Sequence, residues 1–247
     1  MLFELLNALR SGGTEEAKQL LIVFLMWLPI IMLSLSFHEA SHAFIAYKLG
    51  DPTARNFGRV TLNPTKHLDP IGFIAMLTIG FGWAKPCPVN ARNFKNPKKG
   101  MALTALAGPV SNLILAIGFT VLLSICHIVS VIVTIAMNAE SIPVVFSYIS
   151  LFFYYAVYLN VSLAIFNFIP VPPLDGSRIL GLLLPDKAYY WFMRYERYIG
   201  IGFALVVIIL GQFNISIIGF VVSPITDFLD TVAVIPAQLI IDLLALL

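Results

Sequence analysis

Two histidines and a glutamate stand at a spacing that suits metal-dependent hydrolysis. They form the run His38-Glu39-Ala40-Ser41-His42. On an α-helix of about 3.6 residues per turn, the two imidazoles project from one face and can bind the same zinc ion. Glu39, beside the first imidazole, can act as general base on a metal-bound water. These residues lie in the last part of an apolar run that begins near Leu20, where an ionisable side chain is costly unless it has a partner or a function.

A catalytic zinc site needs a third protein ligand and a position left open for water. Asp175 is the candidate that the sequence favours, because it follows an apolar run that ends near Phe168. The prolines of the segment 170–173 prevent a regular helix before it. Extended backbone at that depth must line a cavity, since its polar groups are otherwise unpaired. Alone, this segment is more typical of a turn that ends a span; together with the histidine pair, it predicts Asp175 as the third ligand.

Other ligand-type residues are less suitable because of where they lie. His67 and Asp69 stand among turn-forming residues, which predicts a solvated loop. His127 and Glu140 are expected on the side of the membrane opposite the histidine pair. We therefore expect none of the four to bind the metal.

The cysteines and the N-terminus carry little further information. Cys87 lies in a polar stretch and Cys126 in an apolar one, so we expect neither a disulfide nor zinc ligation. The first 19 residues include acidic side chains and do not resemble a removable signal peptide.

The composition predicts a membrane protein independently of the motif. Of 247 residues, 59% are hydrophobic and 11% are charged, and the mean hydropathy is +0.91. A net charge of +2 gives no reason to expect a nucleic-acid partner. We predict one integral membrane domain over residues 1–247, with its core motifs within residues 34–183 and no room for a second soluble domain.

Apolar runs of suitable length predict the helices that must position the site. The expected fold class is an all-α polytopic membrane protein with about four to six transmembrane helices and short extended or re-entrant segments near the active site. Residues 51–70 are expected to form a loop or short hairpin, and 71–82 a piece too short to span. Apolar character persists to residue 137, so the second span is either overlong or followed by another helix. The tail 227–247 is expected to be a last span or an interfacial helix. The predicted spans are 20–49, 101–125, 145–168 and 199–222.

The loop charges predict an orientation. Basic side chains gather between the first two spans and again between the third and fourth, whereas the connection 138–143 has Glu140 and no Lys or Arg. By the positive-inside rule, both basic loops are cytoplasmic. The expected location is therefore a cell membrane, crossed several times, with the metal site opening toward the cytoplasm.

The two separated motifs together resemble those of the site-2 protease family, the M50 intramembrane zinc metalloproteases. The resemblance is closest to the compact branch without a PDZ domain and covers roughly residues 34–183. Ala40 and Ser41 depart from the residues that many members carry, but neither is a ligand position. The matching stretches are His38-Glu39-Ala40-Ser41-His42, Asn167-x-x-Pro170-x-Pro172-x-Leu174-Asp175-Gly176, Asn63-Pro-x-Lys-His-x-Asp-Pro-x-Gly72, Gly82-Trp-Ala-Lys-Pro and Gly108-Pro-x-x-Asn112.

The resemblance implies roles for individual residues. His38, His42 and Asp175 would bind one zinc ion per chain, Glu39 would be catalytic, and Asn167 would bind the substrate or polarise its carbonyl. The implied partners are a membrane-embedded protein substrate and the lipid bilayer; the oligomeric state is left open. The alternative function is that of a non-proteolytic metal-binding membrane protein, a transporter or a sensor, with Glu39 as a proton carrier.

Overall fold

We describe the protein from a computed structural model, which places residues 7–8, 13–79, 84–212 and 217–244. Within these ranges the chain is helical apart from its connections. Among the described residues, four stretches are long and apolar enough to cross a membrane: Thr14–Lys48, Pro97–Ala136, Val144–Phe168 and Gly219–Leu243. The chain is therefore an all-α, multi-pass membrane protein, as the composition predicts.

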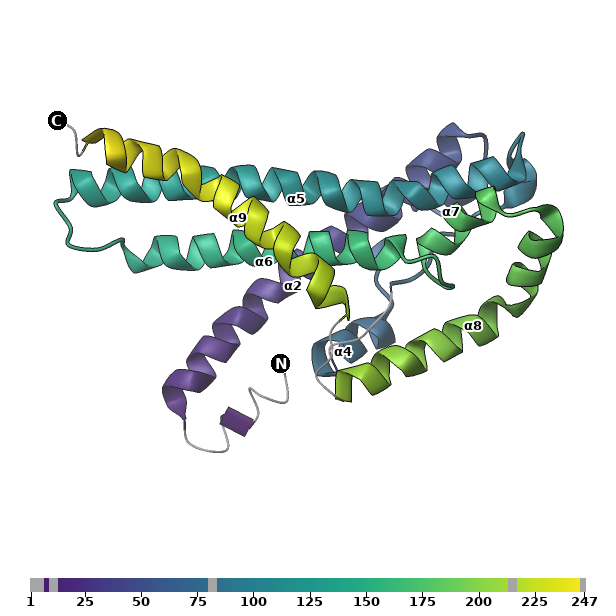
Figure 1. The fold of residues 1–247 in the computed structure, drawn as a ribbon, viewed down its shortest axis with the longest axis horizontal. Helices are drawn as coiled ribbons and strands as arrows, with labels where there is room; N and C mark the ends of the chain where they lie inside the picture. The colour runs from purple at the N-terminus through teal and green to yellow at the C-terminus, as the bar shows by residue number, and fades with distance from the viewer. Residues whose placement is uncertain (1–6, 9–12, 80–83, 213–216, 245–247) are drawn as a thin grey trace.

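Three long helices form the centre of the molecule (Figure 1). Helix α5 (Pro97–Ala136) lies alongside α6 (Val144–Phe168), and α2 (Thr14–Lys48) crosses both. The 40 residues of α5 extend about 60 Å, roughly twice the thickness of the hydrocarbon layer. The apolar stretch up to residue 137 is thus one overlong helix. The predicted first and third spans are confirmed as α2 and α6.

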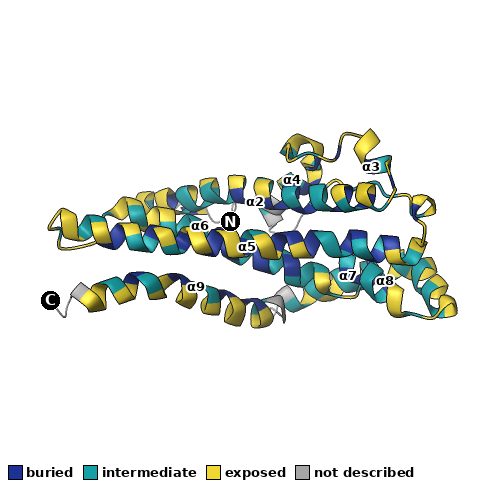
Figure 2. Cartoon of the chain, turned by 90° about the horizontal axis from the view of Figure 1, so that it is seen from above, coloured by how far each residue is buried: buried dark blue, intermediate teal, exposed yellow. Residues whose placement is uncertain are grey.

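The core lies where these helices meet, and it is built mainly from small and β-branched side chains. Outward, α5 exposes a stripe of large apolar side chains at helical spacing, Ile114, Ile117, Val121 and Ile125, each at least half exposed. Figure 2 shows buried and exposed residues along the same helix. A stripe of this kind is typical of a helix that faces lipid. The fully buried cluster comprises Ile30, Ala116, Phe119, Ala156, Val157, Val161 and Val222.

The predicted fourth span, residues 199–222, does not coincide with a single described helix. Helix α8 (Asp186–Gln212) begins earlier and ends within this stretch, and α9 (Ile217–Leu244) follows it; residues 213–216 lie outside the described residues. Of the two expectations for the tail, the last span fits the length and composition of α9.

The connection between α2 and α5 contains short helices. They are α3 (Thr53–Asn56), η1 (Pro64–Lys66), α4 (Pro70–Ile79) and η2 (Ala91–Asn93). Of the two expectations for residues 51–70, the loop fits these turns and short helices, and the hairpin is wrong, because the described residues there pair only through an isolated bridge between Leu68 and Ala84. Side-chain caps such as Asn63 on the Thr65 amide stabilise turns instead. With ten residues, α4 is too short to span, as predicted.

Candidate metal centre

Helix α2 presents the two histidines to the interior of the bundle. His38 and His42 each expose 6% of their surface. Their ring centroids are 4.6 Å apart and the ring planes are nearly perpendicular, at 87°. The spacing of four residues thus places both imidazoles on the buried face of α2, as the sequence predicts.

Asp175 joins them from a different part of the chain. It is the first residue of α7 (Asp175–Leu183), directly after the proline-rich segment. Its Oδ2 atom lies 3.1 Å from His38 Nε2 and 3.3 Å from His42 Nε2. Ligand atoms about 2.0–2.1 Å from a tetrahedral zinc ion are about 3.3 Å apart. Oδ2 is also buried and has no hydrogen-bond partner, so the three side chains, which form a possible metal-binding cluster, fit a zinc ion.

The outer ring nitrogens of both histidines have polar partners. His42 Nδ1 donates to the carbonyl oxygen of Thr104 at 2.7 Å, and His38 Nδ1 lies 2.5 Å from Asn112 Oδ1. Each neutral imidazole then has its lone pair on Nε2, facing Asp175. Without a metal, protons on both Nε2 atoms would place two imidazolium ions around one carboxylate in the bundle interior, which is costly. Zinc bound by the two lone pairs removes that cost.

Two glycines allow the helices to approach the site closely. A Cβ atom on Gly108 of α5 would lie 2.5 Å from His38 Nε2 and from His42 Cε1. A Cβ atom on Gly176 would lie 2.3 Å from the Phe168 carbonyl oxygen at the end of α6. Pro109 also lies in this part of α5 and has no amide N–H, so the helix lacks one backbone hydrogen bond there. The Thr104 carbonyl oxygen, which accepts from His42 Nδ1, belongs to the same region of the helix.

Glu39 is half-buried on α2, next to His38. Burial, followed by the negative charge of Glu39, raises the pKa of the Cys87 thiol to about 12. Cys87 is therefore neutral and lies within electrostatic range of Glu39. The sequence analysis did not predict an electrostatic effect of Glu39 on Cys87, because this effect depends on how the α2–α5 connection folds.

Asn167 is the next-to-last residue of α6 and is half-buried. Its Nδ2 donates to the carbonyl oxygen of Leu163 at 2.9 Å. One of its two N–H groups is thus engaged by its own helix, and the second remains as a possible donor to a substrate. Its catalytic role stays a prediction.

His67 differs from the expectation of a solvated loop. It is fully buried, and its Nε2 donates to the Thr61 carbonyl oxygen at 2.6 Å. Arg59, also buried, donates to the carbonyl groups of Lys66, Lys85 and Pro86. The carbonyl partners of Arg59 lie up to 27 residues away along the chain. The turn-forming residues around His67 therefore do not predict that this loop is buried. The cluster that could hold a metal within the described residues consists of His38, His42 and Asp175; that His67 is not a ligand stays a prediction.

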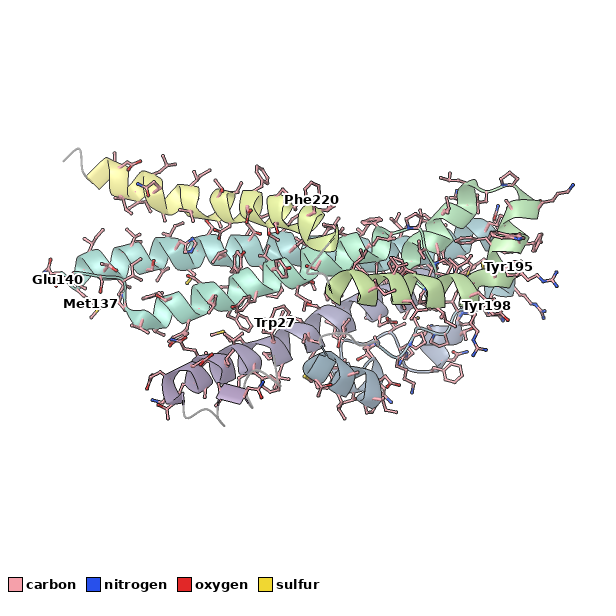
Figure 3. The ribbon with its side chains drawn as sticks, turned by 60° about the horizontal axis from the view of Figure 1, so that its bottom comes forward. Trp27, Met137, Glu140, Tyr195, Tyr198 and Phe220 are labelled. Atoms are coloured by element: carbon pink, nitrogen blue, oxygen red, sulfur yellow. The ribbon has the colours of Figure 1, made fainter. Side chains whose placement is uncertain are left out.

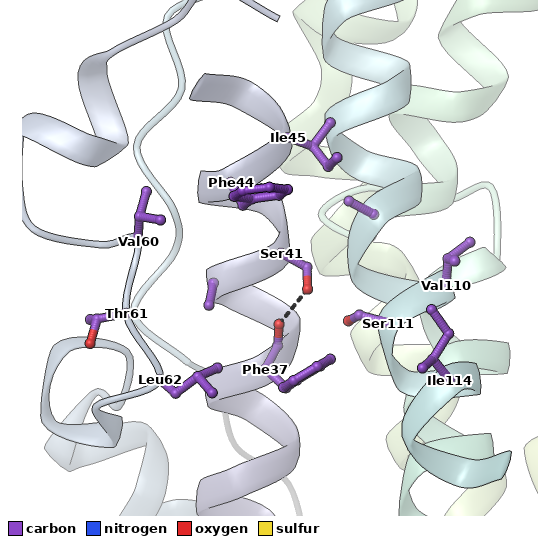
Figure 4. A pocket seen from close by; sticks show the side chains of 12 residues that line it. Phe37, Ser41, Phe44, Ile45, Val60, Thr61, Leu62, Val110, Ser111 and Ile114 are labelled. Atoms are coloured by element: carbon purple, nitrogen blue, oxygen red, sulfur yellow. Dashed lines mark hydrogen bonds between the residues drawn. The ribbon is translucent and has the colours of Figure 1, made fainter. Parts of the chain in front are cut away.

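A groove of about 430 Å³ lies between α2, α5 and residues 60–62 (Figure 4). On α2 it is lined by Phe37, Ala40, Ser41 and Phe44. Neither His38 nor Glu39 is among its lining residues, so this groove opens on a face of α2 different from the one that carries the metal-binding cluster.

Comparison with known proteins gives a consistent picture. The model of "Peptidase family M50" matches residues 26–210. The "Putative zinc metalloprotease YwhC" of Bacillus subtilis is 46% identical over 169 residues, which are 68% of this chain and 73% of that protein. The zinc metalloprotease MJ0392 of Methanocaldococcus jannaschii is 28% identical over 195 residues, 78% of this chain and 45% of that protein. No solved structure matches the chain significantly.

Proposed function

The chain belongs to peptidase family M50, and we propose that it is a zinc metalloendopeptidase that cleaves a membrane protein in or near a transmembrane segment. The observation that carries the proposal is the unpartnered Asp175 Oδ2 beside two histidine Nε2 atoms, inside a bundle of membrane-crossing helices. A zinc ion held there would supply a Lewis acid and an activated water.

The chain's own residues would then perform the proton transfers. Glu39, adjacent in sequence to a ligand, accepts a proton from the attacking water and returns it to the leaving amine. The free N–H of Asn167 donates to the carbonyl oxygen on which charge develops. Because the amides of a substrate helix are already hydrogen-bonded, the substrate must unwind locally before cleavage.

The site would open toward the cytoplasm. Figure 3 shows Met137 and Glu140 at one end of the molecule and Tyr195 and Tyr198 near the other. Lys98, at the start of α5, pairs with Asp186, at the start of α8, with 2.6 Å between Nζ and Oδ1. The two basic segments therefore meet at one end, which supports a common cytoplasmic side.

A cleavage assay tests this function. Wild type and Glu39→Gln are reconstituted in lipid vesicles with a substrate that has one transmembrane segment, and zinc content is measured for both. We expect cleavage by wild type and none by Glu39→Gln with zinc retained. Equal cleavage by both proteins would overturn the assignment, and zinc binding without cleavage by wild type would favour the alternative of a metal-binding transporter or sensor.

A further inference from the structure

A chain of buried polar side chains runs from His38 away from the metal-binding cluster. Ser34 on α2, Asn112 on α5 and Asn160 on α6 are each 0% exposed. Asn112 Nδ2 donates to Asn160 Oδ1 at 2.8 Å, and Asn160 Nδ2 donates to Ser34 Oγ at 2.9 Å and to the Ala156 carbonyl oxygen at 2.8 Å. Helices α2, α5 and α6 are thus joined by one series of hydrogen bonds.

The orientation of each amide in this series of hydrogen bonds is determined at the end farthest from His38, where Asn160 meets the Ala156 carbonyl. The Ala156 carbonyl oxygen can only accept, so the NH₂ group of Asn160 must face it and the Asn160 carbonyl oxygen must face Asn112. Asn112 must in turn present its NH₂ group to Asn160 and its oxygen to His38 Nδ1, 2.5 Å away. The proton of His38 therefore resides on Nδ1, and Nε2 has its lone pair free for a metal.

His42 obtains the same tautomer without any side chain, because the Thr104 backbone carbonyl accepts from its Nδ1 at 2.7 Å. Asn112 has one additional contact with a backbone acceptor, the Ser34 carbonyl at 3.4 Å. This distance exceeds the range of a normal N–H···O hydrogen bond. Of the two ligand histidines, His38 thus depends on side-chain amides for its orientation.

We propose that Asn160 is a positioning residue for zinc: it holds the Asn112 amide in the orientation that keeps His38 Nε2 unprotonated. The inference rests on the proposed zinc site and adds to it a residue two hydrogen bonds removed from the ligand. Without Asn160, the Asn112 amide can rotate and present NH₂ to Nδ1, which moves the His38 proton to Nε2 and blocks coordination.

The proposal is tested by measuring the zinc affinity of the full chain in detergent micelles. The affinity is obtained from competition with a fluorescent chelator. Asn160→Leu keeps a side chain that branches at Cγ and removes both the acceptor and the donors. Loss of a hydrogen-bonding partner behind a metal ligand lowers metal affinity about 10–100-fold. We expect about a tenfold loss here, because the contact between Asn112 Nδ2 and the Ser34 carbonyl oxygen still favours the original orientation of the Asn112 amide. Ser34→Ala is the matched control, because Asn160 retains its bond to the Ala156 carbonyl; its zinc affinity should match wild type.

A double-mutant comparison separates positioning from packing. In an Asn112→Asp background, His38 faces a carboxylate, which accepts in either orientation. Adding Asn160→Leu should then leave zinc affinity unchanged or raise it. An equal loss of affinity in both backgrounds, or a loss in Ser34→Ala as large as in Asn160→Leu, would overturn the proposal and assign the amides to packing alone.

Nitrogen-15 NMR of zinc-loaded wild type gives a measurement that does not depend on how the variants fold. We expect His38 to be protonated at Nδ1 and bound to zinc through Nε2. Zinc bound through His38 Nδ1 would overturn the inference. A wild type that binds no zinc at all would refute the proposed function itself, which distinguishes the two failures.

Discussion

A single methyl group added at Gly108 should disable the metal centre. In Gly108→Ala, the new Cβ atom would lie 2.5 Å from His38 Nε2 and Cε1 and from His42 Cε1. Ordinary van der Waals contact begins at 3.4 Å, so the rings must move away by about 0.9 Å. Metal–ligand distances tolerate only about 0.2 Å. The displacement is therefore several times larger than a zinc site accepts.

We expect zinc affinity to fall at least about 100-fold in Gly108→Ala, since the change displaces two ligands at once. Activity should fall by a similar factor, because a misplacement of about 1 Å at the reacting groups costs about 100-fold. Zinc affinity is measured by chelator competition, and circular dichroism reports whether the helices remain formed. Gly118→Ala is the matched control on the same helix, because a Cβ atom there meets nothing within 4 Å. If Gly108→Ala binds zinc as tightly as Gly118→Ala, the deduced packing of α5 against the histidine pair is wrong.

Two further predictions concern the connection between α2 and α5. Burial opposes ionisation of Asp51, but hydrogen bonds from Thr53, Asn93 and Asn90 outweigh it and lower the pKa of the carboxyl. The stabilisation is therefore fully present above the ordinary pKa of about 3.9 and is lost as the pH falls below it, through the lower pKa of the folded state. The Tm difference between wild type and Asp51→Asn should shrink below about pH 4; a difference that is constant down to pH 3 would contradict this. Arg59→Ala should release the segment 85–86, because it removes the hydrogen bonds to the carbonyl groups of Lys85 and Pro86. Burial raises the pKa of the Cys87 thiol to about 12, so release should increase the rate of Cys87 alkylation at pH 8 at least about tenfold. An unchanged rate would show that Arg59 does not hold the segment.

The sequence was sufficient to predict the elements whose signal is local. The runs around His38 and before Phe168 have the length and hydropathy of spanning helices, and the four-residue histidine spacing determines a shared helix face. The approach of Asp175 to the histidines followed from matching depth and from the family resemblance, and the structure brings the three side chains together.

What the sequence did not reveal depends on contacts between distant residues. Asn160 is an ordinary polar residue in an apolar helix until α6 packs beside Asn112 and Ser34. Arg59 similarly finds its acceptors 26 and 27 residues away. The start of α8 at Asp186 was not predicted, because hydropathy reports how apolar a stretch is and does not report where a helix begins.

X-ray absorption at the zinc edge tests the central claim most directly, that His38, His42 and Asp175 together hold one zinc ion. The purified full chain should contain one zinc in a four-coordinate site with nitrogen and oxygen neighbours at about 2.0–2.2 Å, two of them imidazole nitrogens. In Asp175→Asn the zinc content should fall sharply. A sulfur neighbour at about 2.3 Å, which only a cysteine such as Cys87 would supply, or full zinc retention in Asp175→Asn, would contradict the account.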